Sequence, residues 1–215
     1  ALLVNFRLMG AQIEWAITGA FGDNLHGPAQ QLAMKSGLSE EGVAYLESLG
    51  TYINYNGYGA TLDDLHCHPD ALYLQLYESG TPAEFKHTET FSRLSEGYAA
   101  DLLASSSLKP VAEKSGFAIY QLPEKAWARR VSGVFSNKLA RDYPERAHAV
   151  LTENEDGSFL VSVRAPMIRR RGALSVCKQF ESGGGREAAA GINNLPAADV
   201  SRFASAMAGE YDTHS

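Results

Sequence analysis

The sequence predicts an α/β protein in which a mostly helical amino-terminal part precedes a small α/β domain with a mixed sheet. Three observations favour this fold class: helix-spaced apolar residues dominate the first half, β-rich runs appear in the second half, and the sign of the charge balance reverses between them. The 215 residues, 45% hydrophobic and 20% charged, have room for one domain or two small ones.

The first half has the apolar spacing of helices. The expected helices span residues 24–37, 38–50, 70–80 and 91–106. Ser39 is the expected N-cap of the second helix and Gly50 its expected end. The opening stretch ALLVNFRLMGAQ is typical of the middle of a helix and has no features of a signal peptide. We therefore expect the chain to be the carboxyl-terminal part of a longer protein.

The second half predicts strands and helices in alternation. The expected order is a strand at FAIYQL (117–122), a helix at GVFSNKLARDY (133–143), a hairpin across AHAVLTENEDGSFLVSVRAP (147–166), a helix at GALSVCKQF (172–180), a glycine loop, a strand at AAAGI (188–192) and a helix at PAADVSRFASAMAGEY (196–211). The Asp-Gly pair favours the primed turns that match strand twist. These elements predict a compact module around a small mixed sheet.

The charge distribution marks a domain junction. Residues 1–124 carry 6 Lys and Arg against 15 Asp and Glu, whereas residues 125–180 carry 11 against 5. We expect a domain over 1–107, a linker with the first strand over 108–124, and a second domain over 125–215. The basic face of the second domain is either a polyanion-binding surface or merely solvated.

Cysteine usage and hydropathy indicate the compartment. Cys67 and Cys177, 110 positions apart, form no disulfide framework and fit a reducing cytoplasm. Because no apolar stretch approaches the roughly 20 residues needed to cross a bilayer, we expect a soluble protein without a membrane partner. The sequence leaves the oligomeric state open, a homodimer included.

The stretch GGGREAAAG (183–191) is the main candidate for a ligand site. A backbone without Cβ atoms at Gly183, Gly184 and Gly185 allows close approach of a ligand, and consecutive N–H groups can form an anion site. Arg186 would add a fork of donors suited to a phosphate or carboxylate. The alternative is that the glycines form a flexible connector and the alanines pack tightly against a neighbour.

Two further polar clusters carry weaker signals. LDDLHCHPD (62–70) groups potential metal ligands, but no second cluster completes a closed zinc site, so we expect a solvated turn. The arginines of RAPMIRRRGA (164–173) include Arg164 at a strand end and a triple arginine, which we expect on an exposed loop that attracts polyanions.

The stretch GGGREAAAG resembles the loop Gly-Gly-His-x-x-Ala-Ala-Gly of the DHHA1 domain, which closes DHH-family phosphoesterases. RRVSGVFSNKLA, RAHAVLT and GINNLP agree in order with that domain, so the resemblance covers at least residues 117–210. It implies that Arg164, Gly183, Gly184, Gly185 and Arg186 bind substrate. Gly185 stands where the family commonly has histidine, so Arg186 would replace that imidazole only as a charge clamp.

The first half is similar to the end of a DHH domain. WAITGAFGDN (15–24) resembles the fourth motif of that family, whose aspartate, here Asp23, binds manganese. From the residues alone, Asp23 either follows a strand that delivers a carboxylate to a pocket for Mn²⁺ or Mg²⁺, or caps the helix that starts near Leu25. The resemblance favours the metal ligand.

The resemblance also defines what the chain lacks. The Asp-x-Asp and Asp-His-His motifs of the family occur nowhere in the 215 residues, and one aspartate cannot hold two metal ions. We therefore expect this chain to bind no metal alone and assign it no catalytic residue. It would supply one ligand and the phosphate clamp of a Mn²⁺-dependent phosphodiesterase acting on short oligonucleotides, nucleotides or other small phosphoesters. The alternative is a non-catalytic nucleic-acid or nucleotide-binding module.

Overall fold

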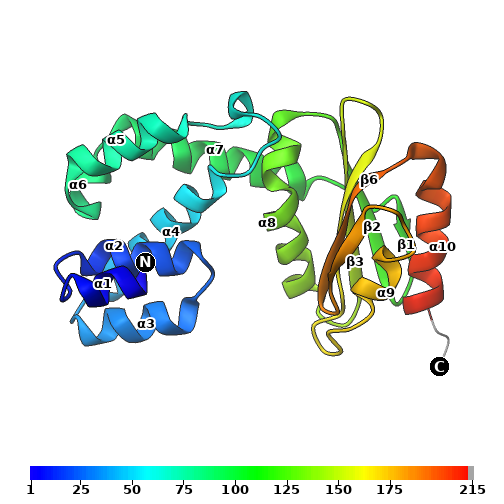
Figure 1. Cartoon of the computed structure of the whole chain (residues 1–215), viewed down its shortest axis with the longest axis horizontal. Helices are drawn as coiled ribbons and strands as arrows, with labels where there is room; N and C mark the ends of the chain where they lie inside the picture. Colours follow the sequence, from blue (N-terminus) through cyan, green and yellow to red (C-terminus); the bar gives the residue numbers. More distant parts are fainter. Residues whose placement is uncertain (213–215) are drawn as a thin grey trace. The chain divides into compact units, whose positions relative to one another are not determined.

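The computed structural model describes residues 1–212, which divide into two compact units, one over residues 1–100 and one that begins at residue 101. The first unit is helical and the second contains all the strands of the described residues (Figure 1). This arrangement confirms the predicted α/β class with a helical part before a mixed sheet. The expected domain boundaries at residues 107 and 124 stay a prediction. The last three residues of the expected second domain, 213–215, lie outside the described residues.

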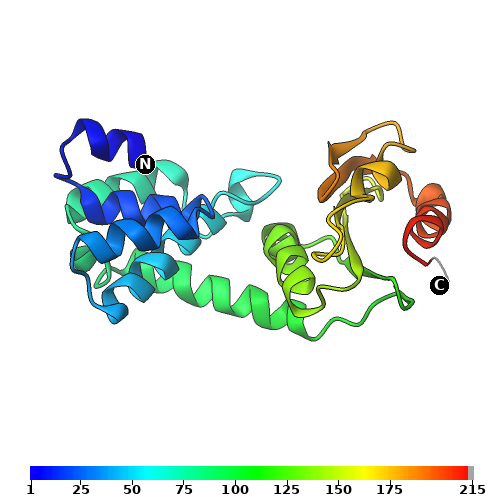
Figure 2. The same cartoon turned by 90° about the horizontal axis from the view of Figure 1, so that it is seen from below.

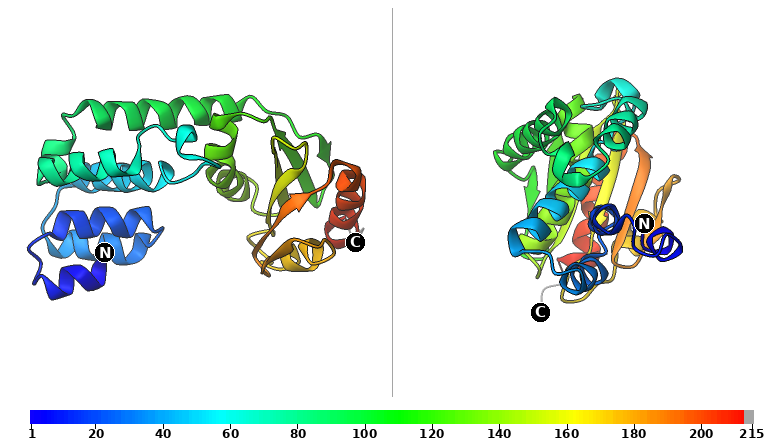
Figure 3. Two further views of the ribbon diagram at one scale, coloured as in Figure 1. Left: turned by 45° about the horizontal axis from the view of Figure 1, so that its top comes forward. Right: turned by 90° about the vertical axis from the view of Figure 1, so that its left-hand side faces the viewer.

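Helices alone build the first unit (Figure 3). They are α1 (Leu2–Arg7), α2 (Ile13–Gly22), α3 (His26–Lys35), α4 (Glu40–Tyr55), α5 (Pro69–Ser79), α6 (Pro82–Phe85), the greater part of α7 (Glu89–Ser106), and the short 3-10 helix η1 (Leu62–Asp64). The Ser39 hydroxyl accepts a hydrogen bond from the Gly42 amide at 3.2 Å, which confirms the predicted N-cap of α4. No described helix has the length and hydropathy needed to cross a membrane.

The prediction that α4 ends at Gly50 is wrong. Gly50 is buried in mid-helix, and α4 continues to Tyr55. A Cβ atom at Gly50 would lie 2.1 Å from the Thr18 carbonyl oxygen of α2, and one at Gly22 would lie 2.8 Å from the Gly50 carbonyl oxygen. Both glycines therefore serve a backbone-to-backbone contact between α2 and α4.

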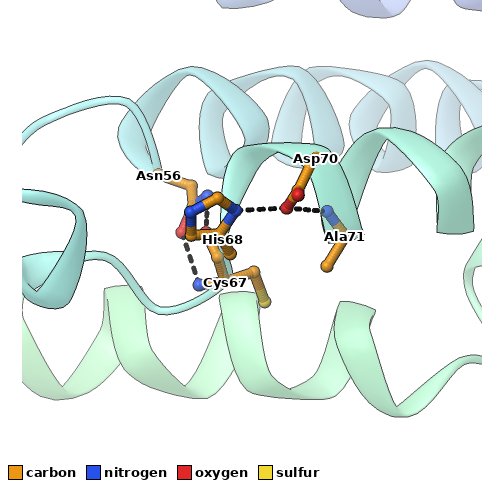
Figure 4. Close-up of polar contacts among 5 residues, drawn as sticks. All are labelled: Asn56, Cys67, His68, Asp70 and Ala71. Atoms are coloured by element: carbon orange, nitrogen blue, oxygen red, sulfur yellow. Dashed lines mark hydrogen bonds and ion pairs between the residues drawn. The ribbon is translucent and has the colours of Figure 1, made fainter.

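The segment LDDLHCHPD is an anchored connection rather than a fully solvated turn. His68 and Asp70 are exposed, as expected, but Asp64 and Cys67 are buried. The Asn56 side chain holds the Cys67 backbone from both sides, donating to its carbonyl at 2.8 Å and accepting from its amide at 3.0 Å (Figure 4). Because buried polar groups need hydrogen-bond partners, these two bonds account for the buried Asn56 side chain and hold the backbone at Cys67 in place.

The second unit is a six-stranded mixed sheet in the order β1-β2-β3-β4-β6-β5. The elements are β1 (Ala112–Glu113), β2 (Phe117–Leu122), α8 (Ala126–Asp142), β3 (Ala147–Glu153), β4 (Phe159–Arg164), α9 (Ala173–Cys177), β5 (Gly183–Arg186), β6 (Ala189–Leu195), the 3-10 helix η2 (Ala197–Asp199) and α10 (Val200–Tyr211). β2 and β3 are parallel, and all other neighbours are antiparallel. The predicted strand at 117–122 and the hairpin around Asp-Gly are confirmed.

The two faces of the sheet bury different helices, which lie on opposite sides of it (Figure 2). Alternate strand residues such as Ile119, Ala149 and Val163 pack with α9 and α10. The other face, including Tyr120 and Val150, packs with α8. Side chains alternate between the two faces along a strand, and both faces of β2 and β3 are buried. These two strands therefore have nearly continuous apolar runs.

A fully buried histidine lies at the start of β3. The Nε of Arg146 donates to Nε2 of His148 at 3.2 Å, and Nδ1 of His148 has no hydrogen-bond partner within residues 1–212. Burial, helped by the nearby charge of Arg146, lowers the pKa of His148 from 6.5 to about 4. The imidazole is therefore neutral in the folded protein at physiological pH.

Replacing Gly50 by alanine should destabilise the first unit by about 1–3 kcal/mol, the usual effect of overpacking, because the added methyl group would meet backbone atoms of α2. The free energy of unfolding can be followed by the fluorescence of Trp15 on α2 in a Trp127→Phe background. Gly27→Ala is the matched control, since a Cβ atom there meets nothing within 4 Å. Equal stability of the two variants would contradict the proposed contact.

Stability of the sheet unit should fall by about 3 kcal/mol as the pH drops from 6.5 to 4, because the unfolded chain protonates His148 near 6.5 while the folded chain does so near 4. Denaturant unfolding at several pH values, read from Trp127 in a Trp15→Phe background, measures this loss. His148→Gln should remove that component of the pH dependence, whereas replacement of the exposed His87 should retain it. An unchanged pH profile in His148→Gln would refute the assignment.

Candidate functional site

The sheet brings Arg164 and Arg186 onto one row across three strands. Arg164 of β4 is paired with Ala189 of β6, and Ala189 is paired with Arg186 of β5. Residues paired directly across antiparallel strands point to the same face, so both arginines lie on the face against which α8 packs, over β2, β3 and β4. Two strand spacings separate them, about 10 Å between Cα atoms.

The guanidinium of Arg164 is held in place by two neutral side chains. Its Nε donates to Oδ1 of Asn137 on α8 at 2.9 Å, and its Nη1 donates to the Ser162 hydroxyl at 2.9 Å. Arg164 is half-buried, whereas Arg186 is exposed. An arginine fixed in this way loses less side-chain entropy when it binds an anion.

The predicted glycine loop is a strand. Residues 183–186 form β5 and pair with β6, so the interpretations of a ligand loop and of a flexible connector are both wrong about the backbone. Gly183 has a structural cause, since a Cβ atom there would lie 1.7 Å from the Cys177 carbonyl oxygen. At Gly184, a Cβ atom would meet nothing within 4 Å. Of the three glycines, only Gly184 lacks a reason within the described fold.

Gly185 does not occupy the place of the family histidine. Its φ of +136° is one that L side chains rarely adopt, and a Cβ atom would lie 2.5 Å from the Cα of Ala190. Counting back from Ala189, Ala190 and Gly191 in the pattern Gly-Gly-His-x-x-Ala-Ala-Gly, the histidine position is Arg186. In that register Arg186, rather than Gly185, aligns with the histidine of the DHHA1 loop.

Next to the two arginines, the same face carries almost no side-chain bulk. Ser162, Gly191 and Gly184 form the adjacent row of β4, β6 and β5. On the α8 side, a Cβ atom at Gly133 would meet nothing within 4 Å. Small residues therefore lie beside Arg164 and Arg186. We call the row of Arg164, Ala189 and Arg186, together with the adjacent row of Ser162, Gly191 and Gly184, the arginine row.

Sequence reasoning missed Asn137 and Ser162. The alternation of β4 contained a signal for Ser162, because Ser162 and Arg164 are polar positions that alternate with the buried residues Val161 and Val163. No sequence signal pointed to Asn137, since its contact with Arg164 joins residues 27 positions apart. That contact exists only because α8 packs against β4.

Asp23 lies at the rim of a cavity of about 160 Å³ in the first unit. The cavity is lined by α2 and α4 at their glycine contact, with Thr18, Gly22 and Asn54 among its residues. The expectation that a strand precedes Asp23 is wrong, because residues 13–22 form a helix. The expectation that Asp23 caps the next helix is also wrong, since the N-cap of α3 is Leu25 and has no side-chain cap.

The described residues do not fit a complete metal centre. Within residues 1–212, no group of three or more His, Cys, Asp and Glu side chains is placed to hold an ion. Asp23 offers one hard oxygen ligand beside the cavity, while Mn²⁺ or Mg²⁺ takes several. No reaction step can therefore be assigned to a metal held by these residues alone.

Comparisons with known proteins find likenesses among solved structures at low sequence identity. No family model matches the chain, and no curated protein matches it. The pGpG-specific phosphodiesterase PggH from Vibrio cholerae superposes with a TM-score of 0.51 at 13% identity, over 69% of this chain and 53% of that one. CDC45 from Entamoeba histolytica gives a TM-score of 0.48 at 10% identity, over 78% of this chain and 38% of that one.

The chain spans about half the length of PggH. At 13% identity, the likeness shows the fold and leaves the chemistry of individual residues to the geometry described above. The chain therefore shares a fold with PggH over the matched residues.

Proposed function

We propose that this chain is the nucleotide-binding portion of a DHH-family phosphodiesterase acting on short oligonucleotides, nucleotides or other small phosphoesters. The observation that carries the proposal is the arginine row, in which two arginines of one row lie beside an adjacent row that contains Gly184 and Gly191. The specificity of PggH for pGpG supports a nucleotide as the ligand.

In this proposal the two arginines have different roles. Arg164, oriented by Asn137 and Ser162, presents its guanidinium in a fixed direction to one phosphoryl group. Arg186 has no hydrogen bond or ion pair to any residue between 1 and 212 and is free to close over the ligand. Gly184 leaves room for the ligand to approach the backbone of β5.

Asp23 would be one ligand of the divalent ion that such an enzyme uses. Mn²⁺ or Mg²⁺ would stabilise charge on the phosphoryl oxygens when bound. The remaining ligands would have to come from sequence outside these 215 residues, because the described residues do not supply them.

Both cysteines are buried free thiols, which supports the proposed cytoplasmic location.

A non-catalytic nucleotide-binding module is the second candidate. It is favoured by the same shortage of ligands around Asp23. Binding does not separate the two candidates, because both include the arginine row. The presence of Asp-x-Asp and Asp-His-His motifs upstream in the complete gene would favour the enzyme, and their absence would favour the binding module.

Arg186→Ala should weaken binding of a nucleoside monophosphate by about 1.5–3 kcal/mol, or roughly 10- to 100-fold, since it removes a hydrogen bond to a charged group. Isothermal titration measures the effect. Gly184→Ala should weaken binding at least as much by filling the approach to β5, although the fold itself leaves room for the methyl group. The exposed Lys178, replaced by alanine, is the charge control. Arg186→Ala behaving like Lys178→Ala would contradict the clamp.

The 215-residue chain should show no Mn²⁺-dependent hydrolysis of an aryl phosphodiester, because a single aspartate cannot hold two ions. A colorimetric assay with and without added Mn²⁺ tests this expectation. Metal-dependent turnover that is lost in Asp23→Ala and kept in Asp63→Ala, an exposed carboxylate away from the cavity, would show it to be wrong.

A further inference from the structure

A groove with a volume of about 380 Å³ lies between α3 and α4 of the first unit. Both helices pack against α2, and this packing buries Ala29 and Ala33 of α3 and Leu46 of α4. The residues that line the groove, which we call the acidic groove, are Gln30, Met34, Leu38, Glu40, Val43, Ala44 and Glu47.

The middle of the acidic groove is apolar. Val43 and Ala44 line it from α4, and Met34 lines it from α3. The Met34 side chain is 80% exposed, so packing within the first unit does not explain a large apolar residue at this position. An unbranched methionine side chain adapts its shape to a partner, and methionine is frequent at surfaces that bind other proteins.

A carboxylate lies at each end of this apolar middle. Glu40 and Glu47 are seven residues apart, which places them on one face of α4 about 10 Å apart along the helix axis. Glu40, in the first turn of α4, also suits the helix dipole, whereas Glu47 in mid-helix gains nothing from it. Glu47 lies 3.2 Å from Nδ1 of the exposed His26. The side chain of Lys35 leaves α3 in a direction about 100° from that of Met34, so it does not neutralise the groove.

The charge of the first unit selects the occupant. Residues 1–100 carry 4 Lys and Arg against 12 Asp and Glu. This excess of negative charge disfavours nucleic acid and anionic lipid surfaces as ligands. A second copy of the chain is disfavoured as well, because a two-fold interface would place Glu40 and Glu47 against the same carboxylates of the other copy. The groove therefore favours a basic partner.

We propose that the acidic groove binds a basic amphipathic helix of a partner protein. Apolar residues at positions i+3 and i+4 of that helix contact Met34, Val43 and Ala44. Lys or Arg at positions i and i+7 reach Glu40 and Glu47, whose spacing they match. Insertion of an amphipathic helix into an apolar groove is a common mode of peptide recognition. This inference goes beyond the proposed function and concerns the first unit alone, so it does not depend on nucleotide binding by the arginine row.

The test uses a synthetic alanine-based helical peptide of about 20 residues that carries Lys at i and i+7 and Leu at i+3 and i+4. Fluorescence anisotropy measures its binding to the 215-residue chain. Glu40→Gln, Glu47→Gln should weaken binding about fivefold at about 0.1 M salt, the loss of two exposed ion pairs, and the difference should vanish at about 1 M salt. Met34→Gln should weaken binding about tenfold at both salt concentrations, because it removes an apolar contact.

The matched controls change the same residue types outside the groove. Glu84→Gln, Glu96→Gln removes two exposed carboxylates, and Met167→Gln replaces another exposed methionine. Neither control should change the affinity. A peptide with Glu in place of Lys should not bind. Because Met34 is exposed and the two Glu→Gln changes keep side-chain size, we expect all these variants to fold.

The site of binding is read from the methyl resonances of the four methionines. The peptide should shift the resonance of Met34 and leave that of Met167 unchanged. Binding that leaves the Met34 resonance unchanged, or that the controls weaken as much as the groove variants do, overturns the proposal, as does the absence of binding. Equal binding of the Glu-containing peptide overturns the basic occupant. A Met34 resonance that shifts with protein concentration in the absence of peptide overturns the proposal in favour of a second copy.

Discussion

The close packing of β5 against the end of α9 is the constraint on which the candidate site depends. Gly183 lies so near the Cys177 carbonyl that no other residue fits, and Gly185 turns the strand through a backbone conformation open to glycine. With β5 held there, Arg186 stands opposite Ala189 and in line with Arg164. A larger residue at 183 would displace the strand and separate the two arginines.

The site combines one fixed cation with one mobile cation. Arg164 is half-buried and anchored to α8 and to its own strand, so its direction is set before any ligand arrives. His148, which is paired with Arg164 across β3 and β4, is buried and neutral, so it adds no positive charge that would repel the Arg164 guanidinium. Arg186 at the exposed edge keeps its rotamer freedom. Such a pair balances preorganisation against access for the ligand.

Glycine has a different role in the helical unit. Gly22 and Gly50 allow α2 and α4 to touch through their backbones, and the small residues at this contact leave the cavity beside Asp23. A helix end, rather than a strand end, therefore carries this carboxylate. Apolar periodicity could not distinguish these cases for WAITGAFGDN, because a short, nearly continuous apolar run suits either a buried helix or a buried strand.

The sequence by itself determined most of the order of elements in the second half, the mixed sheet after a helical part and the hairpin at Asp-Gly, because these depend on local periodicity and turn chemistry. Residue type made Arg186 a candidate, and the family resemblance added Arg164. Tertiary structure alone decided that residues 183–186 form a strand, that Gly50 lies inside a helix, and that Asn137 orients Arg164. Each of these depends on atoms of another element: the backbone of β6 for the strand, the Thr18 carbonyl for Gly50 and the Arg164 guanidinium for Asn137. No local pattern encodes such contacts, because packing between elements creates them.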